Sequence, residues 1–333
     1  MNVPRISVCI PTRNRAALLE GCIQSILGQT HPSFEIVISD NCSTDDTPAV
    51  VARFKDARIR YYRNESNLGP FGNMNRLLEL ARGDYVNIAH DDDLYAPEFL
   101  SRGAELLDQH PNVGMVHCAV RQIDETGTVR RIVRAYPSTR VLERKKEFVR
   151  YLAGHNVCCS TVMARRKLYL QTGGFDPEHI CADFLMWIRL ALLADLAYVA
   201  EPLADMRVHP VTVTNSLDPD TWYREFVAIQ QEGFELGIRS YPDLKPRRAE
   251  LFRVAAKVQG RRFLIETFAA IARGDHEFAR GYTRGLERFE SVGLSPLYAR
   301  VGRSLHNRLG RMLLATAAWV RRAFGRRFAV VRD

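Results

Sequence analysis

The sequence predicts an α/β fold with a mostly parallel sheet flanked by helices, followed by a helical C-terminal extension. Short β-rich runs alternate with segments of helical apolar spacing from Ile6 to Pro97. Strands that alternate with helices form parallel sheets through right-handed crossovers. Each of these strands is followed by polar residues, and after Asn215 the pattern becomes helical throughout.

The expected elements follow one another in a regular order. The predicted strands are residues 6–10, 34–39, 58–62, 85–89, 113–118 and 157–164. Helices are expected over 17–27, up to Phe54, up to Leu80, from Pro97, and over 143–152 and 182–190. Ser43 or Thr44 can cap the second of these helices. Residues 122–133 are typical of a hairpin, and residues 173–176 of a tight turn.

A short apolar run stops abruptly at three consecutive aspartates, Asp91, Asp92 and Asp93. Open α/β sheets bind their ligands at the carboxyl ends of the strands, where these side chains are expected. Adjacent carboxylates repel one another, so the cluster favours a site that a cation neutralises. Oxygen ligands favour Mg²⁺ or Mn²⁺. The alternative is a solvated acidic turn before the helix near Pro97.

Two further aspartates are candidates for chemistry. Asp40 follows the second strand and can accept the N3–H of a uracil or thymine ring, or else form an Asx turn. Asp183 stands at the head of an apolar helix, as an N-cap or as a partly desolvated general base.

No G-x-G-x-x-G or G-x-x-x-x-G-K-[ST] follows a strand, which argues against a dinucleotide-binding dehydrogenase and a P-loop enzyme.

Composition limits the cellular setting. Seven cysteines without a C-x-x-C pair indicate reduced thiols of a cytoplasmic protein. No apolar run approaches the roughly 18 residues of a spanning helix. Most of the formal charge of +9 belongs to residues 295–333, which hold nine arginines and one acid.

The C-terminal part is expected to form helices over 221–236, 247–273 and 276–289. We therefore expect two domains, residues 1–214 and 215–333. The last segment has an apolar stripe surrounded by arginines, which indicates peripheral binding to an anionic inner membrane face. Alternatively, the stripe packs on the preceding helices. Nucleic-acid binding is not expected, because no RNP-like strand accompanies the basic charge.

Eight segments between Ile6 and His209 together resemble the family 2 glycosyltransferases of the GT-A fold. They are residues 7–15, 35–45, 67–69 with Asn75, 81–85, 91–93 with Pro97, 173–176, Asp183 with Trp187 and Arg189, and 202–203 with 207–209. The resemblance implies that the residues binding the nucleotide sugar are Pro11, Thr12, Arg13, Asp40, Asn67, Asn75 and Asp91. It further implies Asp92, Asp93 and His209 as metal ligands, and Asp183 as the catalytic base.

The chain departs from this family pattern at three positions. Many members carry an acid where this chain has His90 and a small residue where it has Asp91, so the roles of the carboxylates are shifted or shared. Many also carry arginine where this chain has Met74, which removes a phosphate contact.

The activity that the resemblance implies is an inverting sugar transfer that depends on Mg²⁺ or Mn²⁺. The donor would be a nucleotide-diphosphate sugar, with UDP or dTDP favoured by Asp40. The acceptor would be a hydroxyl of a glycan or a lipid-linked molecule in bacterial surface polysaccharide synthesis. Two alternatives remain: a catalytically silent GT-A-fold protein that binds a nucleotide or glycan, and a nucleotidyltransferase.

Overall fold

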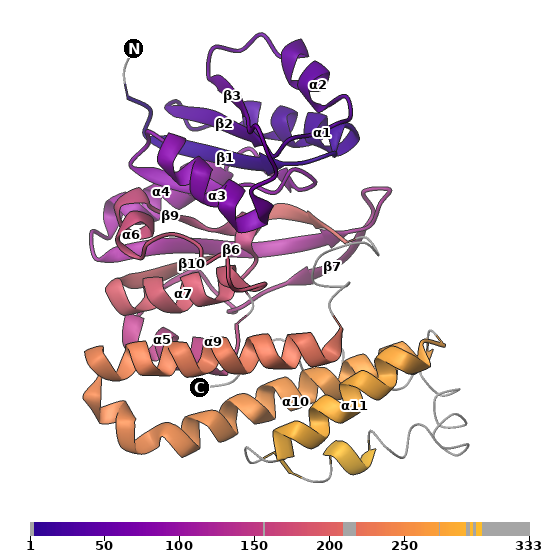
Figure 1. The fold of residues 1–333 in the computed structure, drawn as a ribbon. Coiled ribbons are helices and arrows are strands. Elements are labelled where there is room, and N and C mark those ends of the chain that lie inside the picture. Colours follow the sequence, from indigo (N-terminus) through magenta and orange to yellow (C-terminus); the bar gives the residue numbers. More distant parts are fainter. Residues whose placement is uncertain are drawn as a thin grey trace. The chain divides into compact units, whose positions relative to one another are not determined.

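The computed structural model describes residues 3–155, 157–208, 218–272, 274–290, 294–295 and 298–301. The chain divides into two compact units, one of residues 1–147 and 156–209 and one of residues 148–155 and 210–333 (Figure 1). The domain boundary expected after residue 214 lies outside the described residues.

The first unit alternates strands and helices over its first half. Its strands are β1 (Ile6–Thr12), β2 (Phe34–Asp40), β3 (Ile59–Arg63), β4 (Tyr85–Ile88), β5 (Leu94–Tyr95), β6 (Val113–Ile123), β7 (Val129–Val133), β8 (Arg140–Leu142), β9 (Met163–Arg165) and β10 (Asp195–Arg207). Its helices are α1 (Ala16–Leu27), α2 (Thr47–Arg53), α3 (Gly69–Leu80), α4 (Phe99–Gln109), α6 (Arg166–Gln171) and α7 (Ala182–Leu193), and α5 (Arg144–Ala153) runs from this unit into the other.

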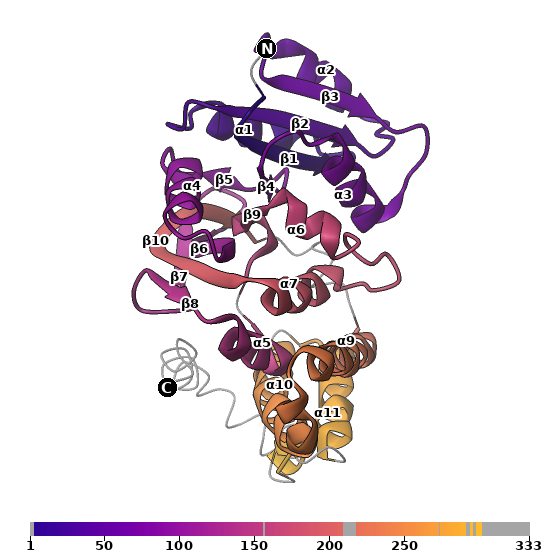
Figure 2. The ribbon, with the colours of Figure 1, turned by 90° about the vertical axis from the view of Figure 1, so that its left-hand side faces the viewer.

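One sheet organises this unit, with the strand order β3-β2-β1-β4-β9-β6-β10-β5. The first four strands are parallel, β9 is antiparallel to both of its neighbours, and β6 is parallel to β10. Helices α3, α6 and α7 lie on one face of the sheet, and α1 and α4 on the other (Figure 2). The predicted mostly parallel sheet flanked by helices is thus confirmed.

The register of the parallel strands brings the expected ligand edge together. Thr12, the last residue of β1, pairs with Asp40, the last residue of β2. On the other side, Cys9 of β1 pairs with Ile88, where β4 ends. Every residue of β2 and β4 is buried, as expected for central strands with helices on both faces. The polar residues that follow β1, β2 and β4 therefore meet at one edge.

The strand prediction was wrong in two places. Residues 157–164 do not form one strand: Cys159–Thr161 is a 3₁₀ turn, and only Met163–Arg165 pairs in the sheet. Strand β10 was not predicted, because Glu201, Pro202 and Asp205 interrupt its apolar pattern. The sheet accommodates Pro202 at an irregularity, where the register against β6 shifts on both sides of the proline.

Two helix starts also differ from the prediction. Helix α2 begins at Thr47 after Asp46, because Ser43 and Thr44 are used elsewhere: the Ser43 hydroxyl accepts the Asn14 N–H, and the Thr44 N–H donates to the Asn14 side chain. Helix α4 begins at Phe99 rather than Pro97, since the preceding residues form β5 against β10.

The described part of the second unit contains three long helices, α9 (Pro219–Ser240), α10 (Arg248–Ala272) and α11 (His276–Glu290). Asp218 caps α9 by accepting the N–H groups of Asp220 and Thr221. The Phe289 ring of α11 packs edge-on against Phe226 of α9 and Phe263 of α10. The predicted helical extension is confirmed, whereas most of the expected basic helix, residues 302–333, lies outside the described residues.

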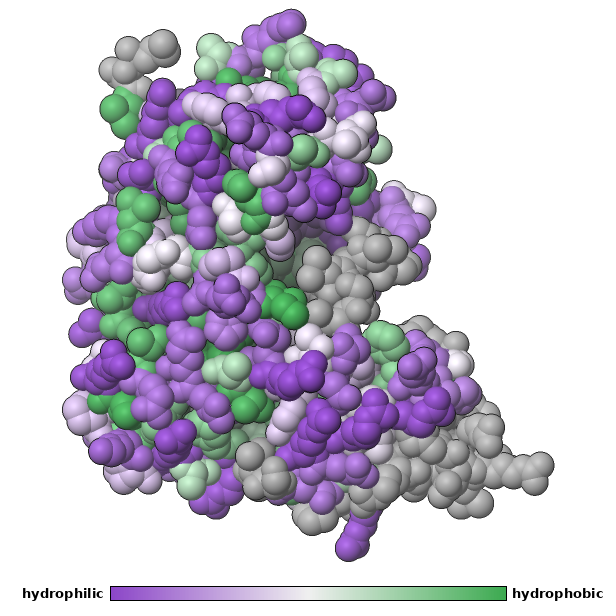
Figure 3. Space-filling view, viewed as in Figure 1, coloured by the Kyte–Doolittle hydropathy of each residue, from purple (hydrophilic) through white to green (hydrophobic). Residues whose placement is uncertain are grey.

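The surface carries little contiguous apolar area on the face seen in Figure 3. Hydrophilic residues cover most of this face, and hydrophobic residues form small separate groups. Among the described helices, none combines the length and the hydropathy that a membrane span requires.

Gly83 permits a close approach of two backbones. A Cβ atom built on Gly83 would lie 2.6 Å from the Ser7 backbone N and 2.8 Å from the Ile6 carbonyl carbon. The Gly83 N–H also donates to the Ser7 hydroxyl. We expect Gly83→Ala to lower the free energy of unfolding by about 3 kcal/mol, because backbone atoms of β1 cannot move aside. Urea denaturation measures this, and Gly28→Ala, at a glycine with φ −79° whose built Cβ atom meets nothing closer than 3.6 Å, is the comparison for simple loss of a glycine. A Gly83→Ala effect no larger than the Gly28→Ala effect would contradict the account.

Candidate functional site

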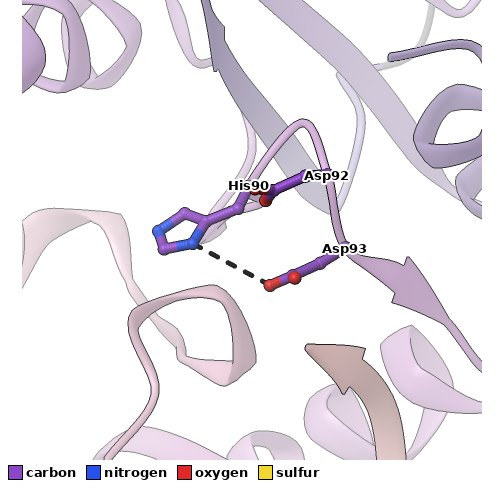
Figure 4. A group of neighbouring side chains, drawn as sticks. All are labelled: His90, Asp92 and Asp93. Atoms are coloured by element: carbon purple, nitrogen blue, oxygen red, sulfur yellow. Dashed lines mark ion pairs between the residues drawn. The ribbon is translucent and has the colours of Figure 1, made fainter. Parts of the chain in front are cut away.

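The centre of the site is the turn that joins β4 to β5 (Figure 4). The buried strand ends at Ile88, the Ala89 N–H donates to the Cys9 carbonyl of β1, and the Asp93 N–H donates back to the His90 carbonyl. This tight reversal gathers three side chains from four consecutive residues. His90, Asp92 and Asp93 each offer a ligand atom, and these atoms lie within 4.8 Å of one another.

Asp93 is the most enclosed of the three acids, with 1% of its surface exposed. Its Oδ1 atom accepts the Arg207 backbone N–H at 3.0 Å. Its Oδ2 atom is buried without a hydrogen-bond partner among the described residues, 3.8 Å from Nδ1 of His90. Burial raises the pKa of Asp93 to about 6, and the charge of Asp92 reinforces the shift, whereas His90, the nearby Ser160 hydroxyl and the Arg207 N–H oppose it.

Asp91 and Asp92 share an arginine that the sequence did not single out. Nη1 of Arg15 lies 2.5 Å from Oδ2 of Asp92 and 3.9 Å from Oδ1 of Asp91. Burial raises the pKa of Asp91 to about 6, while the neighbouring Thr12 hydroxyl opposes the shift. Arg15 directly follows the polar turn after β1, at the ligand edge of the sheet. This position is the sequence feature from which Arg15 could have been predicted as a site residue.

Asp183 lies in the first turn of α7, whose N-cap is Cys181. Asp183 is therefore not the N-cap, although its Oδ1 atom accepts the Phe184 N–H at 2.9 Å. Burial raises the pKa of Asp183, whereas the Phe184 N–H and the charge of His90 lower it. The effect of His90 indicates that Asp183 lies near the β4–β5 turn, although the two are far apart in the sequence.

Asp40 is fully buried, and both of its oxygens are already engaged. Oδ1 accepts the Ser43 N–H at 2.8 Å, and Oδ2 accepts the Tyr61 hydroxyl at 2.5 Å. The first contact reaches the N–H three residues on, one residue farther than in the Asx turn that was the alternative role for Asp40. A nucleobase would reach Asp40 only after Tyr61 moved, so the expected base contact stays a prediction.

The two asparagines expected to bind the donor hold backbone segments in place. Oδ1 of Asn67 accepts from the Asn41 side chain at 2.7 Å and from the Gly69 N–H at 3.1 Å. The Asn75 amide donates to the Phe175 carbonyl at 2.7 Å and accepts the Phe175 N–H at 2.8 Å. Asn75 thus fixes the turn at residues 173–176, where Gly174 has φ +83°.

The remaining predicted residues differ in accessibility. Arg13 is exposed on the loop after β1, and Pro11 is half-buried in β1 opposite Ser39. Met74 is buried in α3. His209 lies outside the described residues, so its expected metal contact stays a prediction.

Cys42 adopts a left-handed backbone conformation in the loop after β2, with φ +63°. This conformation costs a residue with a Cβ atom roughly 1–2 kcal/mol. Cys42→Gly relieves this strain, but the greater freedom of glycine in the unfolded chain offsets part of the gain. We therefore expect the free energy of unfolding to rise by about 0.5–1 kcal/mol. Cys42→Ala keeps the strain and removes the thiol, so it should not show this gain. Equal stabilisation in both variants would assign the effect to the thiol.

The arrangement combines carboxylates and an imidazole at the carboxyl edge of a parallel sheet with a separate, half-buried carboxylate, Asp183. Such an edge binds nucleotide-linked substrates in open α/β sheets. A proton acceptor close to a potential cation site suits a group transfer to a hydroxyl. The fold and the site together fit an enzyme that transfers a group from a nucleotide-linked substrate to a hydroxyl.

The model of glycosyl transferase family 2 matches residues 7–173, and the chain belongs to this family. It is therefore a glycosyltransferase. A relative from Campylobacter jejuni, the GalNAc(5)-diNAcBac-PP-undecaprenol beta-1,3-glucosyltransferase, is 42% identical over 118 residues, which are 34% of this chain and 37% of that protein.

Two solved structures share the fold. Staphylococcus aureus TarS 1–349 in complex with UDP-GlcNAc has a TM-score of 0.63 and 19% identity, covering 90% of this chain and 87% of that one. The mannosyltransferase PcManGT from Pyrobaculum calidifontis, in complex with GDP-Man and Mn²⁺, has a TM-score of 0.57 and 19% identity, covering 96% and 81%.

Proposed function

We propose that this glycosyltransferase is an inverting, divalent-metal-dependent enzyme that moves a sugar from a nucleotide-diphosphate donor to a hydroxyl of a glycan or lipid-linked acceptor. One observation carries the proposal: ligand atoms of His90, Asp92 and Asp93 lie within 4.8 Å of one another at the carboxyl edge of the parallel sheet. The half-buried carboxylate of Asp183, whose pKa burial raises and the charge of His90 lowers, would be the proton acceptor beside the β4–β5 turn.

The residues of the turn fit a divalent cation. The buried Oδ2 atom of Asp93 has no hydrogen-bond partner among the described residues, and such a carboxylate oxygen is costly unless a cation or donor satisfies it. Asp92 and Asp93 would hold the ion, with His209 as a further expected ligand. When bound, Mg²⁺ or Mn²⁺ offsets the negative charge that develops on the leaving diphosphate. The Mn²⁺ and GDP-Man in the mannosyltransferase structure support this proposal.

Asp183 would accept the proton of the acceptor hydroxyl as its oxygen attacks the anomeric carbon. Burial raises the pKa of this carboxyl, so the carboxylate is a stronger base than an ordinary aspartate. Attack from the face opposite the leaving diphosphate inverts the anomeric centre in a single displacement. Pro11, Thr12 and Arg13 would line the nucleoside, and Asp91 would contact the ribose or the donor sugar.

The substrates are proposed by class. Asp40 at the end of β2 favours a base with an N3–H, that is UDP or dTDP, provided that Tyr61 moves aside. The undecaprenol-linked glycan in the name of the Campylobacter jejuni relative supports a lipid-linked acceptor and a role in surface polysaccharide assembly. A peripheral position on the inner face of the cytoplasmic membrane would place the enzyme beside such an acceptor.

Calorimetric titration of UDP, dTDP and GDP, each with Mn²⁺ and with EDTA, tests the proposal. We expect one uracil or thymine diphosphate to bind only with metal. Binding of all three without metal, and no transfer or hydrolysis of the matching sugar donor, would favour the silent binding protein. Formation of a nucleotide sugar with release of inorganic diphosphate would identify a nucleotidyltransferase instead.

A further inference from the structure

His90 is the first residue of the β4–β5 turn, and its imidazole lies beside the carboxylate of Asp93. Nδ1 of His90 lies 3.8 Å from the buried Oδ2 of Asp93, in the arrangement of Figure 4. This separation is too long for a hydrogen bond, so the contact satisfies neither atom. The His90 side chain is 36% exposed, which leaves the turn open to an ion from solvent.

The spacing of the three side chains suits one shared ion. Metal–ligand bonds of about 2.0–2.3 Å place neighbouring ligand atoms about 3–4.4 Å apart. The ligand atoms of His90, Asp92 and Asp93 lie within 4.8 Å of one another, so a small closing movement would bring all three onto an ion. Asp92 would exchange its contact with Arg15 for this ion.

We propose that His90 supplies a nitrogen ligand to the divalent cation, so that one imidazole and two carboxylates hold it and select Mn²⁺ over Mg²⁺. Imidazole binds first-row transition ions well, whereas Mg²⁺ prefers an all-oxygen environment. This inference rests on the proposed function, because the ion is the one that would hold the donor diphosphate. The inference adds His90 as a ligand, and a preference for Mn²⁺ over Mg²⁺, to the metal site that the two aspartates would form.

Electron paramagnetic resonance of Mn²⁺ bound to the full chain tests the ligand directly. Loss of the free-ion signal measures affinity, and pulsed spectra detect hyperfine coupling to a ligand nitrogen. We expect this coupling in the wild type and in His276→Ala, a control at an exposed histidine of α11. His90→Ala should lose the coupling from this imidazole and bind Mn²⁺ about tenfold or more weakly. His90→Asp should bind Mn²⁺ without the coupling and release it at a several-fold lower Mg²⁺ concentration.

Further outcomes separate this inference from the proposed function. If His90→Ala keeps the full coupling and affinity while His209→Ala loses both, His90 is not a ligand and the inference fails. Absence of Mn²⁺ binding in the folded wild type would also overturn it.

UDP is titrated on the same samples. Metal-dependent UDP binding without coupling to His90 leaves the glycosyltransferase proposal intact, whereas no diphosphate binding with any metal contradicts both. Circular dichroism confirms that each variant is folded.

Discussion

Replacing Asp183 with asparagine is expected to lower the transfer rate by roughly 100- to 10,000-fold, the range by which a positioned general base accelerates reactions. Asparagine has nearly the same shape, and its side-chain oxygen can still accept the Phe184 N–H that now contacts Oδ1. The first turn of α7 should therefore keep its structure. What is lost is the ability to take a proton from the acceptor hydroxyl.

The measurement compares product formation with donor binding in the same preparations. Donor binding with Mn²⁺ should stay at the wild-type level, because Asp183 is assigned to the acceptor. Glu178→Gln is the matched control, since this exposed carboxylate lies in the loop that leads to α7 and should not affect turnover. Near-normal turnover of Asp183→Asn would show that another group accepts the proton.

The sequence predicted the parts of the fold in which local pattern and tertiary environment agree. Strand β4 is a short apolar run bounded by Gly83 and three aspartates, and it is buried throughout. Helices α9 and α11 were predicted for the same reason, since each carries a helical apolar periodicity. The apolar residues of α10 are instead spread around the helix, and its length and lack of proline predicted it. Strand β10 escaped prediction because Pro202 and two acids break its pattern, and only its pairing with β6 makes it a strand.

The sequence predicted which polar residues gather at the candidate site, but not which of their side chains contact one another. The carboxyl-end rule placed Asp40 and the aspartate triplet at one edge, as the register confirms. The bond from Asn75 to Phe175 spans 100 residues, and the ion pair from Arg15 to Asp92 spans 77. Periodicity carries no information about which distant side chains meet. The placement of His90 against Asp93 depends on the shape of one turn, which residue spacing alone did not reveal.

Asp93→Asn is expected to abolish metal-dependent transfer while making the metal-free protein more stable at neutral pH. Loss of a ligand carboxylate should reduce transfer about 100-fold or more. The asparagine oxygen can still accept the Arg207 N–H, and the amide nitrogen replaces the buried Oδ2 atom that lacks a hydrogen-bond partner among the described residues. The variant thus removes a buried charge without removing the contact that holds β10.

The gain in stability should depend on pH in a defined direction. The pKa of Asp93 is about 6 in the folded chain against an ordinary value of 3.8, so the folded state binds more protons than the unfolded state between these values. Stability of the wild type therefore falls as the pH rises through this window, by about 1–3 kcal/mol from this residue. The raised pKa of Asp91 affects the stability of the wild type and of Asp93→Asn alike. The difference in stability between these two proteins therefore reports on Asp93.

Urea denaturation in EDTA at pH 4 and pH 7 measures the difference. Asp93→Asn should exceed the wild type by about 1–3 kcal/mol at pH 7 and match it more closely at pH 4. Glu65→Gln, at an exposed carboxylate, should show no such dependence. With Mn²⁺ present, the wild type should gain stability relative to Asp93→Asn, because only the wild-type carboxylate binds the ion and is stabilised by it. A variant less stable than the wild type at pH 7 in EDTA would mean that the Asp93 carboxylate has a stabilising partner within the protein itself.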